Sequence, residues 1–306
     1  MKYSLGVDVG GTKIAAALID EHGKAFYPSQ VKSVTTDKET MFHKLIECIE
    51  TVFLKSGFDP AEITGMGIGV PGKVDRSNGI AVYQNNLPWS NFPLVSRLKQ
   101  YFAIENIVID NDVYMAAYAE WKMSDVKETD TFVFFTISTG VSCSIIHNGA
   151  FLRGMGFAGE IGLFPVQNKS SLNGMKSLEE SVSGPAIQQV AAKKLGTNLI
   201  TTEGFFKVYQ QGNARAVAAL GEIIESLTHG VYGIISLLDP HKIVFGGGVM
   251  NNNTYLLELL KKELQHYLIP EQKKSLPNID ISKLKQEAGV IGAGLRSLEY
   301  DLQPMS

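Results

Sequence analysis

The amino-acid sequence predicts an α/β protein of two similar lobes, on three observations. Its 306 residues, of which 44% are hydrophobic, can bury a large core, and that length suits two domains better than one. Runs typical of β-strands alternate with runs typical of amphipathic helices. A strand, a turn of small residues, a second strand and a glycine turn occur near the start of each half, at residues 3–23 and 132–149. This repetition indicates an internal duplication.

The first half opens with a predicted hairpin. Tyr3–Val9 and Lys13–Ile19 are rich in β-prone residues, and Gly10-Gly11-Thr12 joins them, because glycine tolerates the backbone angles of a tight turn. Between residues 41 and 53, hydrophobic residues recur at spacings of three and four, which predicts an amphipathic helix that ends at Gly57. Further strands are expected at residues 63–70 and 107–109, and a helix is expected after residues 110–112 and through Trp121.

The second half repeats this plan. Phe132–Ile137 is strongly β-prone, residues 138–140 form a turn, and Ser144–Ile146 returns as a second strand. A long helix over residues 214–238 precedes a buried strand at 242–245, which leads into three glycines. We expect the first lobe to cover residues 1–115 and the second to cover 116–306, with the last helix packed back on the first lobe.

Composition excludes several classes of partner. Lys and Arg total 28 against 31 Asp and Glu, so the chain lacks the cationic excess that binds nucleic acid or an anionic membrane surface. The first residues do not resemble a signal peptide, and no apolar run approaches the roughly 18 residues of a membrane span. Cys48 and Cys143 are far apart and are expected to be packed thiols in a reducing compartment. The chain is therefore predicted to be cytoplasmic.

Two glycine patterns suggest nucleotide motifs that we reject. Residues 67–72 and 154–159 both match GxGxxG, but a dinucleotide site needs a helix directly after the glycines, and residues 73–79 are expected to form a turn. Residues 67–73 also nearly spell a Walker A loop. Val74, however, stands where a hydroxyl must hold magnesium, and Pro71 removes a backbone N–H from the loop.

A better phosphate site is Asp8-Val9-Gly10-Gly11-Thr12-Lys13. A carboxylate ends a strand there, and a glycine turn exposes consecutive backbone N–H groups that suit phosphate oxygens. Asp8 could orient Mg²⁺ or its waters, because that ion prefers few carboxylates together with substrate phosphates. Taken alone, the motif fits equally well with a tight hairpin that ends in a solvated aspartate.

Several short motifs occur in one order along nearly the whole chain. They are DVGGTK at 8–13, VPG at 70–72, NLPW at 86–89, ND at 111–112, STG at 138–140, GEIG at 159–162, LEESVSG at 178–184, GGG at 246–248 and GVIGAG at 289–294. Together they resemble the ROK family of sugar kinases and sugar-responsive repressors. The resemblance implies the two-lobed actin-like ATPase (ribonuclease H-like) fold, with an ATP and sugar cleft between the lobes. It also implies phosphate transfer from ATP to a hydroxyl, at C6, of a hexose or N-acetylhexosamine.

The resemblance also implies roles for individual residues. Asp112 resembles the family's general base, which takes the proton of the attacking sugar hydroxyl; as a lone Asn-Asp pair, residues 111–112 would be read as a helix N-cap. The start of a helix should keep this carboxylate ionised at neutral pH. Asn and carboxylate side chains suit a ring of sugar hydroxyls. The implied phosphate contacts are Asp8, Gly10, Gly11, Thr12, Lys13, Thr139 and Gly140, with Asp8 also facing Mg²⁺; the adenosine-side loop is Gly246, Gly247 and Gly248; the sugar contacts are Gly72, Asn86, Asn111, Asp112, Glu160 and Glu179.

The sequence departs from the family pattern at its zinc site. Leu163 stands where the family has a zinc-binding histidine, and residues 164–177 contain none of the family's cysteines. A closed four-ligand zinc site therefore cannot form, and we expect a zinc-free protein. The family's histidine also touches the sugar, so Leu163 favours a sugar with an N-acetyl group or a β-linked aglycone near the reducing end. N-acetylmannosamine and glucose are the first substrates to consider, and a β-glucoside kinase is an alternative.

A second departure lies after the STG turn, where Ser142-Cys143-Ser144 replaces a run of glycines. If ATP needs a close backbone approach there, turnover could be slow, and a non-catalytic sugar sensor becomes an alternative. A DNA-binding repressor is disfavoured because no basic helix-turn-helix precedes Lys2, and an actin-like filament subunit because of the sugar motifs. The family resemblance suggests a homodimer.

Overall fold

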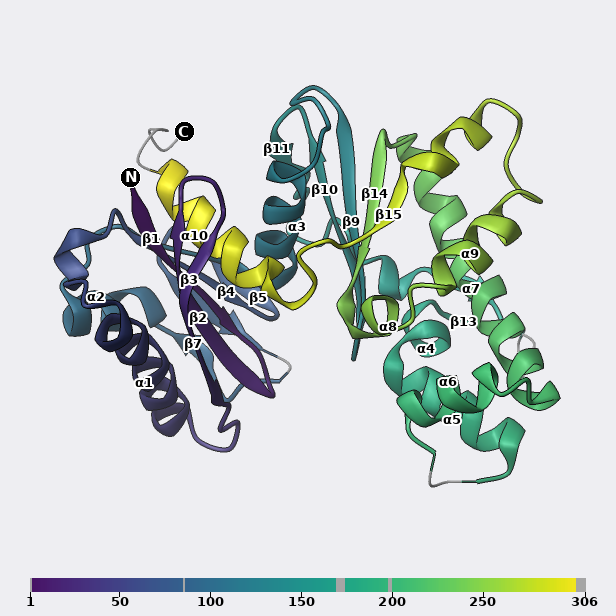
Figure 1. Cartoon of the computed structure of the whole chain (residues 1–306), viewed down its shortest axis with the longest axis horizontal. Coiled ribbons are helices and arrows are strands. Elements are labelled where there is room, and N and C mark those ends of the chain that lie inside the picture. Colours follow the sequence, from purple (N-terminus) through teal and green to yellow (C-terminus); the bar gives the residue numbers. More distant parts are fainter. Residues whose placement is uncertain (1, 85, 169–173, 198–199, 301–306) are drawn as a thin grey trace. The chain divides into compact units, whose positions relative to one another are not determined.

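The computed structural model describes residues 2–84, 86–168, 174–197 and 200–300 (Figure 1). Internal contacts divide the chain into two compact units. Unit 1 comprises Met1–Ser124 and Gln286–Ser306, and unit 2 comprises Asp125–Lys285. The boundary expected after residue 115 lies inside helix α3 (Asp112–Lys122), whereas the units divide after that helix.

Unit 1 is built on a mixed sheet of strand order β3-β2-β1-β4-β8. Strands β1, β2 and β3 form an antiparallel meander, and β4 and β8 run parallel to β1. Helix α1 packs on β2 and β3, and helix α10 packs on β1, β2, β4 and β8 as well as on α3. The elements are β1 (Tyr3–Val9), β2 (Lys13–Asp20), β3 (Ala25–Lys32), α1 (Lys38–Ser56), β4 (Met66–Val70), β5 (Lys73–Asp75), β6 (Ile80–Tyr83), β7 (Ser90–Phe92), α2 (Leu94–Phe102), β8 (Ile107–Asn111) and α10 (Ala288–Tyr300).

The two faces of this sheet follow from side-chain size. Leu5 and Val7 point into the core that also holds the buried residues of α1. The alternate residues of β1 are small and face α10, because strand side chains alternate between faces. A Cβ on Gly6 would lie 1.9 Å from the carbonyl oxygen of Val290. Only glycine therefore allows the helix backbone to approach the strand this closely.

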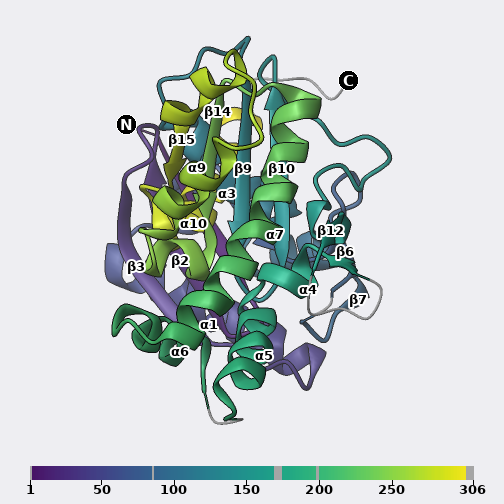
Figure 2. The same ribbon diagram turned by 90° about the vertical axis from the view of Figure 1, so that its right-hand side faces the viewer.

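Unit 2 repeats the plan with the order β11-β10-β9-β14-β15. Its first three strands are again antiparallel, and β14 and β15 run parallel to β9, which confirms the duplicated sheet plan. Figure 2 shows helix α7 running along this unit. The buried residues of α7 share a core with those of β9. The elements are β9 (Thr131–Ile137), β10 (Val141–His147), β11 (Ala150–Phe151), β12 (Pro165–Gln167), β13 (Met175–Ser177), α4 (Glu179–Val182), α5 (Gly184–Leu195), α6 (Thr202–Gln210), α7 (Ala214–Leu238), β14 (Lys242–Gly246), α8 (Gly247–Asn252), α9 (Leu256–Leu264) and β15 (Ile279–Ile281).

Two local expectations are wrong. Residues 73–75 form strand β5, paired with β6, rather than part of a turn; the turn is confined to the following residues, where Asn78 N–H donates to Asp75 Oδ1 (3.0 Å). The return strand of the second hairpin begins at Val141 instead of Ser144. Cys48 and Cys143 are buried free thiols, as expected. Within the described ranges, no helix is long and apolar enough to cross a membrane.

Candidate functional site

In unit 1, Asp8 lies near the end of strand β1, directly before the glycine turn at residues 10–12. The turn closes through a hydrogen bond from Gly10 N–H to the Lys13 carbonyl oxygen (2.9 Å), and the Ser33 hydroxyl donates to the Gly10 carbonyl oxygen (2.6 Å). A Cβ on Gly11 would lie 2.9 Å from Cβ of Asn86. The turn predicted to bind phosphate and a residue predicted to bind sugar are therefore packed against each other.

Asp112 lies at the edge of the same sheet. Asp8, Gly69 and Asp110 occupy matching register positions on β1, β4 and β8. A Cβ on Gly69 would lie 3.3 Å from Cα of Asp112, so the chain passes close over β4 as it enters α3. Asn111 is the N-cap of that helix, and its Oδ1 accepts a hydrogen bond from Val113 N–H (2.9 Å). The pair Asn111-Asp112 therefore does hold the helix cap, at Asn111, and Asp112 is the first helical residue.

Both carboxyl groups titrate above their ordinary range. Burial raises the pKa of Asp112 to about 6, against the hydrogen bond from Val113 N–H, which lowers it. Burial and, next, the charge of Asp112 raise the pKa of Asp8 to about 7, and the Lys13 ammonium opposes this. At neutral pH Asp112 is mostly ionised, as expected, but its pKa is shifted toward the range of a general base.

The turn that contains Gly72 is hydrogen-bonded to the start of α3, where Asn111 and Asp112 lie. Gly72 has a φ of +79°, and a Cβ there would lie 2.2 Å from the Tyr83 carbonyl oxygen, so only glycine fits. Its own carbonyl oxygen accepts a hydrogen bond from Nδ2 of Asn111 (3.0 Å). The amide of Asn111 therefore ties this turn to the start of α3.

Lys13 is held beside the phosphate turn by two amide side chains. Its Nζ lies 3.1 Å from Oε1 of Gln286 and 3.4 Å from Oε1 of Gln30. Neither glutamine was predicted from the sequence. Gln286 reaches the site only because the last segment of the chain belongs to unit 1.

In unit 2, the second predicted phosphate turn links β9 to β10. Ser138 N–H donates to the Gly140 carbonyl oxygen (2.9 Å), which closes the turn around Thr139. Ser142-Cys143-Ser144 lies outside it, in β10, paired with residues 134–136 of β9. The departure from the family pattern thus affects the strand that follows the turn.

The GEIG segment packs on β10 directly beyond this turn. A Cβ on Gly159 would lie 2.0 Å from the Cys143 carbonyl oxygen, and a Cβ on Gly162 would lie 2.2 Å from that of Val141. The two glycines thus contact alternate residues of β10, and Glu160 lies between them in the sequence. Partial burial and, next, the neighbouring Glu179 carboxylate raise the pKa of Glu160.

The three glycines at 246–248 join β14 to α8. Gly247 has a φ of +82°, and a Cβ there would lie 2.3 Å from the Ile137 carbonyl oxygen, at the end of β9. A Cβ on Gly246 would lie 2.4 Å from the ring of Phe134. This junction therefore depends on glycine for close packing, and Gly248 lines a cavity beside it.

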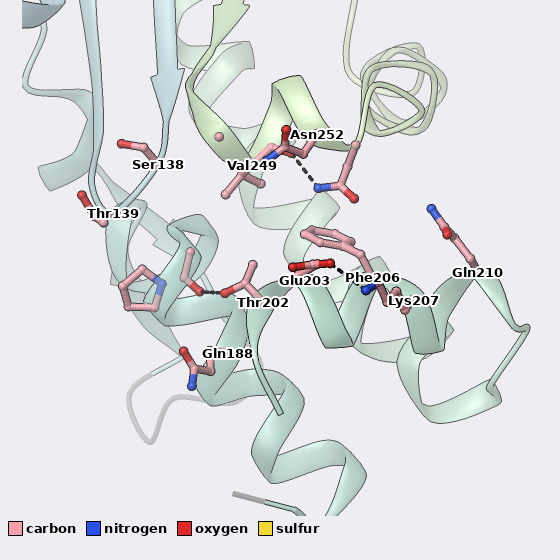
Figure 3. A pocket seen from close by; sticks show the side chains of 14 residues that line it. Ser138, Thr139, Gln188, Thr202, Glu203, Phe206, Lys207, Gln210, Val249 and Asn252 are labelled. Atoms are coloured by element: carbon pink, nitrogen blue, oxygen red, sulfur yellow. Dashed lines mark hydrogen bonds and ion pairs between the residues drawn. The ribbon is translucent and has the colours of Figure 1, made fainter. Parts of the chain in front are cut away.

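That cavity has a volume of about 890 Å³ (Figure 3). Helix α6 contributes the aromatic ring of Phe206 and a Glu203–Lys207 ion pair of 2.6 Å, and the Thr202 hydroxyl donates to the Gly184 carbonyl oxygen at its edge (2.8 Å). Predictions from sequence included Thr139 and Gly248 here but missed the residues of α5, of α6 and of the end of α8. The missed residues include Pro185, Gln188, Phe206, Gln210 and Asn252.

One sequence signal could have predicted the start of α5, which lines this cavity. Ser183 is followed by glycine and proline, a pattern typical of the start of a helix. In the structure Ser183 caps α5, and its Oγ accepts a hydrogen bond from Ala186 N–H (3.3 Å). This N-terminus lies beside the second phosphate turn, because Gly184 N–H donates to the Ser138 carbonyl oxygen (2.7 Å).

Leu163 and residues 164–177 form the segment in which the sequence predicts no zinc site. Among the described residues, no group of three or more His, Cys, Asp or Glu side chains could hold a metal ion. Leu163 is 73% exposed at the end of the GEIG segment. Residues 169–173 of this segment lie outside the described residues.

Comparison with known proteins gives the family. The ROK family model matches residues 4–296. The chain belongs to the ROK family. Among its ROK relatives, a glucokinase of Halalkalibacterium halodurans is 26% identical, with 96% of this chain and 94% of the relative covered. An N-acetyl-D-glucosamine kinase of Haemophilus influenzae is 29% identical, with 94% and 97% covered.

Solved ROK structures align over nearly the whole chain. A ROK glucokinase of Streptomyces griseus in complex with glucose and AMPPNP superposes with a TM-score of 0.77, at 25% identity, covering 95% of this chain and 97% of that one. The fold is therefore the two-lobed actin-like ATPase fold that the family resemblance implied.

Proposed function

We propose that this chain is an ATP-dependent sugar kinase that transfers the γ-phosphate to a hydroxyl of a hexose or N-acetylhexosamine. The observation that carries the proposal is the pair of half-buried carboxylates, Asp8 and Asp112, beside a glycine turn whose Gly11 packs against Asn86. It combines a phosphate-binding backbone, a base and sugar-binding amides within one unit. The kinase names of the ROK relatives support this activity.

Asp112 would accept the proton of the attacking hydroxyl. A general base works best when its pKa lies near the working pH, and burial has raised the pKa of Asp112 to about 6. Gly72, Asn86 and Asn111 would contact the sugar from unit 1, and Glu160 and Glu179 from unit 2.

The donor would bind through the two predicted phosphate turns, at residues 10–12 and 138–140, and through the cavity of unit 2. A cavity of about 890 Å³ with an aromatic ring and amide side chains suits a nucleoside. The AMPPNP complex of the S. griseus relative supports a nucleoside triphosphate as donor. Gly246–Gly248 would lie on the adenosine side, and Thr139 and Gly140 would contact phosphate.

Mg²⁺ fits the residues around Asp8. Burial and, next, the charge of Asp112 raise the pKa of Asp8, so a cation near these two carboxylates would be stabilised. Mg²⁺ prefers few carboxylates together with phosphates and water, which agrees with this donor set. When bound with ATP, the ion would neutralise charge on the transferred phosphate.

Leu163 bears on the choice of sugar. An exposed leucine beside Glu160 offers an apolar surface where a histidine would offer a hydrogen bond, which favours an N-acetyl group or an aglycone over a bare hydroxyl. N-acetylmannosamine and glucose remain our first candidates, and a β-glucoside is the alternative. We expect the protein to act in the cytoplasm, in line with its two free buried thiols, and we expect a homodimer from the family resemblance.

The experiment that tests this proposal is a sugar-dependent ADP-release screen with Mg²⁺ and ATP across hexoses, N-acetylhexosamines and β-glucosides. Turnover above the sugar-free rate with at least one of them is expected. Calorimetry with the same sugars detects binding without turnover, which would instead favour the non-catalytic sensor. Neither turnover nor binding across the panel would contradict the proposal.

A further inference from the structure

The segment Glu179–Gly184 is attached to both ends of the second phosphate turn. At one end, Gly184 N–H donates to the Ser138 carbonyl oxygen (2.7 Å). At the other end, Val141 N–H donates to Oε2 of Glu179 (2.9 Å). The shape of the turn is therefore set jointly by its own hairpin and by this segment.

The peptide bond between Gly140 and Val141 is held on both sides. Its carbonyl oxygen accepts from Ser138 N–H (2.9 Å), and its N–H donates to Glu179. Because a peptide unit is planar, these two hydrogen bonds fix its orientation. A hydrogen bond to an ionised carboxylate is roughly twice as strong as one between neutral groups, so Glu179 supplies the stronger of the two.

Glycines make room for this carboxylate. A Cβ on Gly140 would lie 2.8 Å from Oε2 of Glu179, and a Cβ on Gly162 would lie 3.4 Å from Cβ of Glu179. The Glu179 backbone is fixed as well, since its carbonyl oxygen accepts from Ser183 N–H (3.1 Å) at the end of α4. The side chain is thus seated against the turn by its surroundings.

We propose that Glu179 is a positioning residue for the nucleotide phosphates, and that this role is separate from contact with a sugar. It holds the turn in its binding shape before ATP arrives, so that less conformational freedom is lost on binding. Loss of the carboxylate therefore weakens nucleotide binding even when no sugar is present. The inference rests on the proposed kinase function.

The test is the affinity for AMPPNP with Mg²⁺, measured by calorimetry without sugar. Glu179→Ala is expected to bind about tenfold more weakly than wild type, because a hydrogen bond to a charged group is lost. Glu179→Gln keeps an acceptor oxygen and is expected to stay within about threefold of wild type. Glu180→Ala is the matched control in the same helix, since the Glu180 carboxylate accepts from the Ser177 N–H (3.0 Å) instead.

Hydrogen exchange gives an independent readout. The Val141 amide is expected to exchange faster in Glu179→Ala than in wild type or Glu180→Ala, because its acceptor is gone. If Glu179→Ala does not fold, Glu179→Asp serves in its place, since the shorter side chain withdraws the carboxylate from Val141 and should weaken AMPPNP binding in the same direction.

The outcomes separate this inference from the proposed function. Wild-type affinity for AMPPNP in Glu179→Ala, with only the sugar KM changed, would overturn the positioning role and leave the kinase proposal standing. A wild-type protein that binds no nucleotide would remove the kinase proposal and this inference with it.

Discussion

Asp112 is the residue whose protonation state should control the proposed reaction. Only its ionised form can accept a proton, and burial raises its pKa to about 6. We therefore expect kcat/KM for the sugar to fall as the pH drops through 6, by about tenfold per pH unit from the protonation of Asp112 alone. AMPPNP affinity over the same range is the control for titration of the nucleotide. A rate that stays constant down to pH 5 would show that Asp112 is not the base.

Leu163 should influence which sugar is preferred. Leu163→His restores a hydrogen-bonding group, so relative specificity should shift toward sugars with a free hydroxyl near the reducing end, by about 1–3 kcal/mol. The measurement is the ratio of kcat/KM values across the sugar panel. Leu54→His is the matched control, because Leu54 is also a highly exposed leucine (87%, against 73% for Leu163) but lies on α1 of unit 1, whereas the GEIG segment belongs to unit 2. Unchanged ratios in Leu163→His would mean that this side chain does not contact the sugar.

At the scale of elements, α10 should depend on its glycines. A Cβ on Gly292 would lie 1.7 Å from the carbonyl oxygen of Met115 in α3, so Gly292→Ala must separate the two helices. We expect it to lower the free energy of unfolding by about 2–3 kcal/mol or more, in the range of overpacked cores. Because α10 also packs on β1, the strand that carries Asp8, activity should fall as well.

Gly221→Ala is the matched control, since Gly221 is a helical glycine of α7 where an added Cβ would meet nothing within 4 Å. It should stabilise the protein by roughly 0.5–1 kcal/mol, because alanine is the better helix former. Chemical denaturation of both variants tests the pair. Equal stability changes would contradict the close-packing account of α10.

Local patterns predicted most elements, while contacts between distant segments could not be predicted from them. The spacing of residues 41–53 and the following glycine predicted α1, whose C-cap is indeed Gly57 in a left-handed conformation. The packing of Gly11 on Asn86 and the hydrogen bond from Val141 to Glu179 join segments 38 or more residues apart, and no periodicity reports such a pairing. The cavity of unit 2 was missed for the same reason, because α5 and α6 meet the phosphate turn only in the folded chain.

At the scale of the whole molecule, we predict that the purified protein contains no stoichiometric zinc. Neither Leu163 nor any residue from 164 to 177 is a histidine or cysteine, so the family's four-ligand site lacks its donors. Elemental analysis after dialysis checks this, and treatment with a chelator should leave the melting temperature unchanged. About one tightly held zinc ion per chain would show that other residues have taken over the site.

The most direct test of the account compares turnover and binding in wild type and Asp112→Asn. Asparagine keeps the shape of the side chain and a hydrogen bond but cannot accept the hydroxyl proton, so kcat should fall about 10²- to 10⁴-fold. Calorimetric affinities for the sugar and for AMPPNP should stay within a few-fold of wild type, which excludes a folding defect. Turnover of the variant within a few-fold of wild type would contradict the role of Asp112, and a wild-type protein that binds sugar without turnover would contradict the kinase itself.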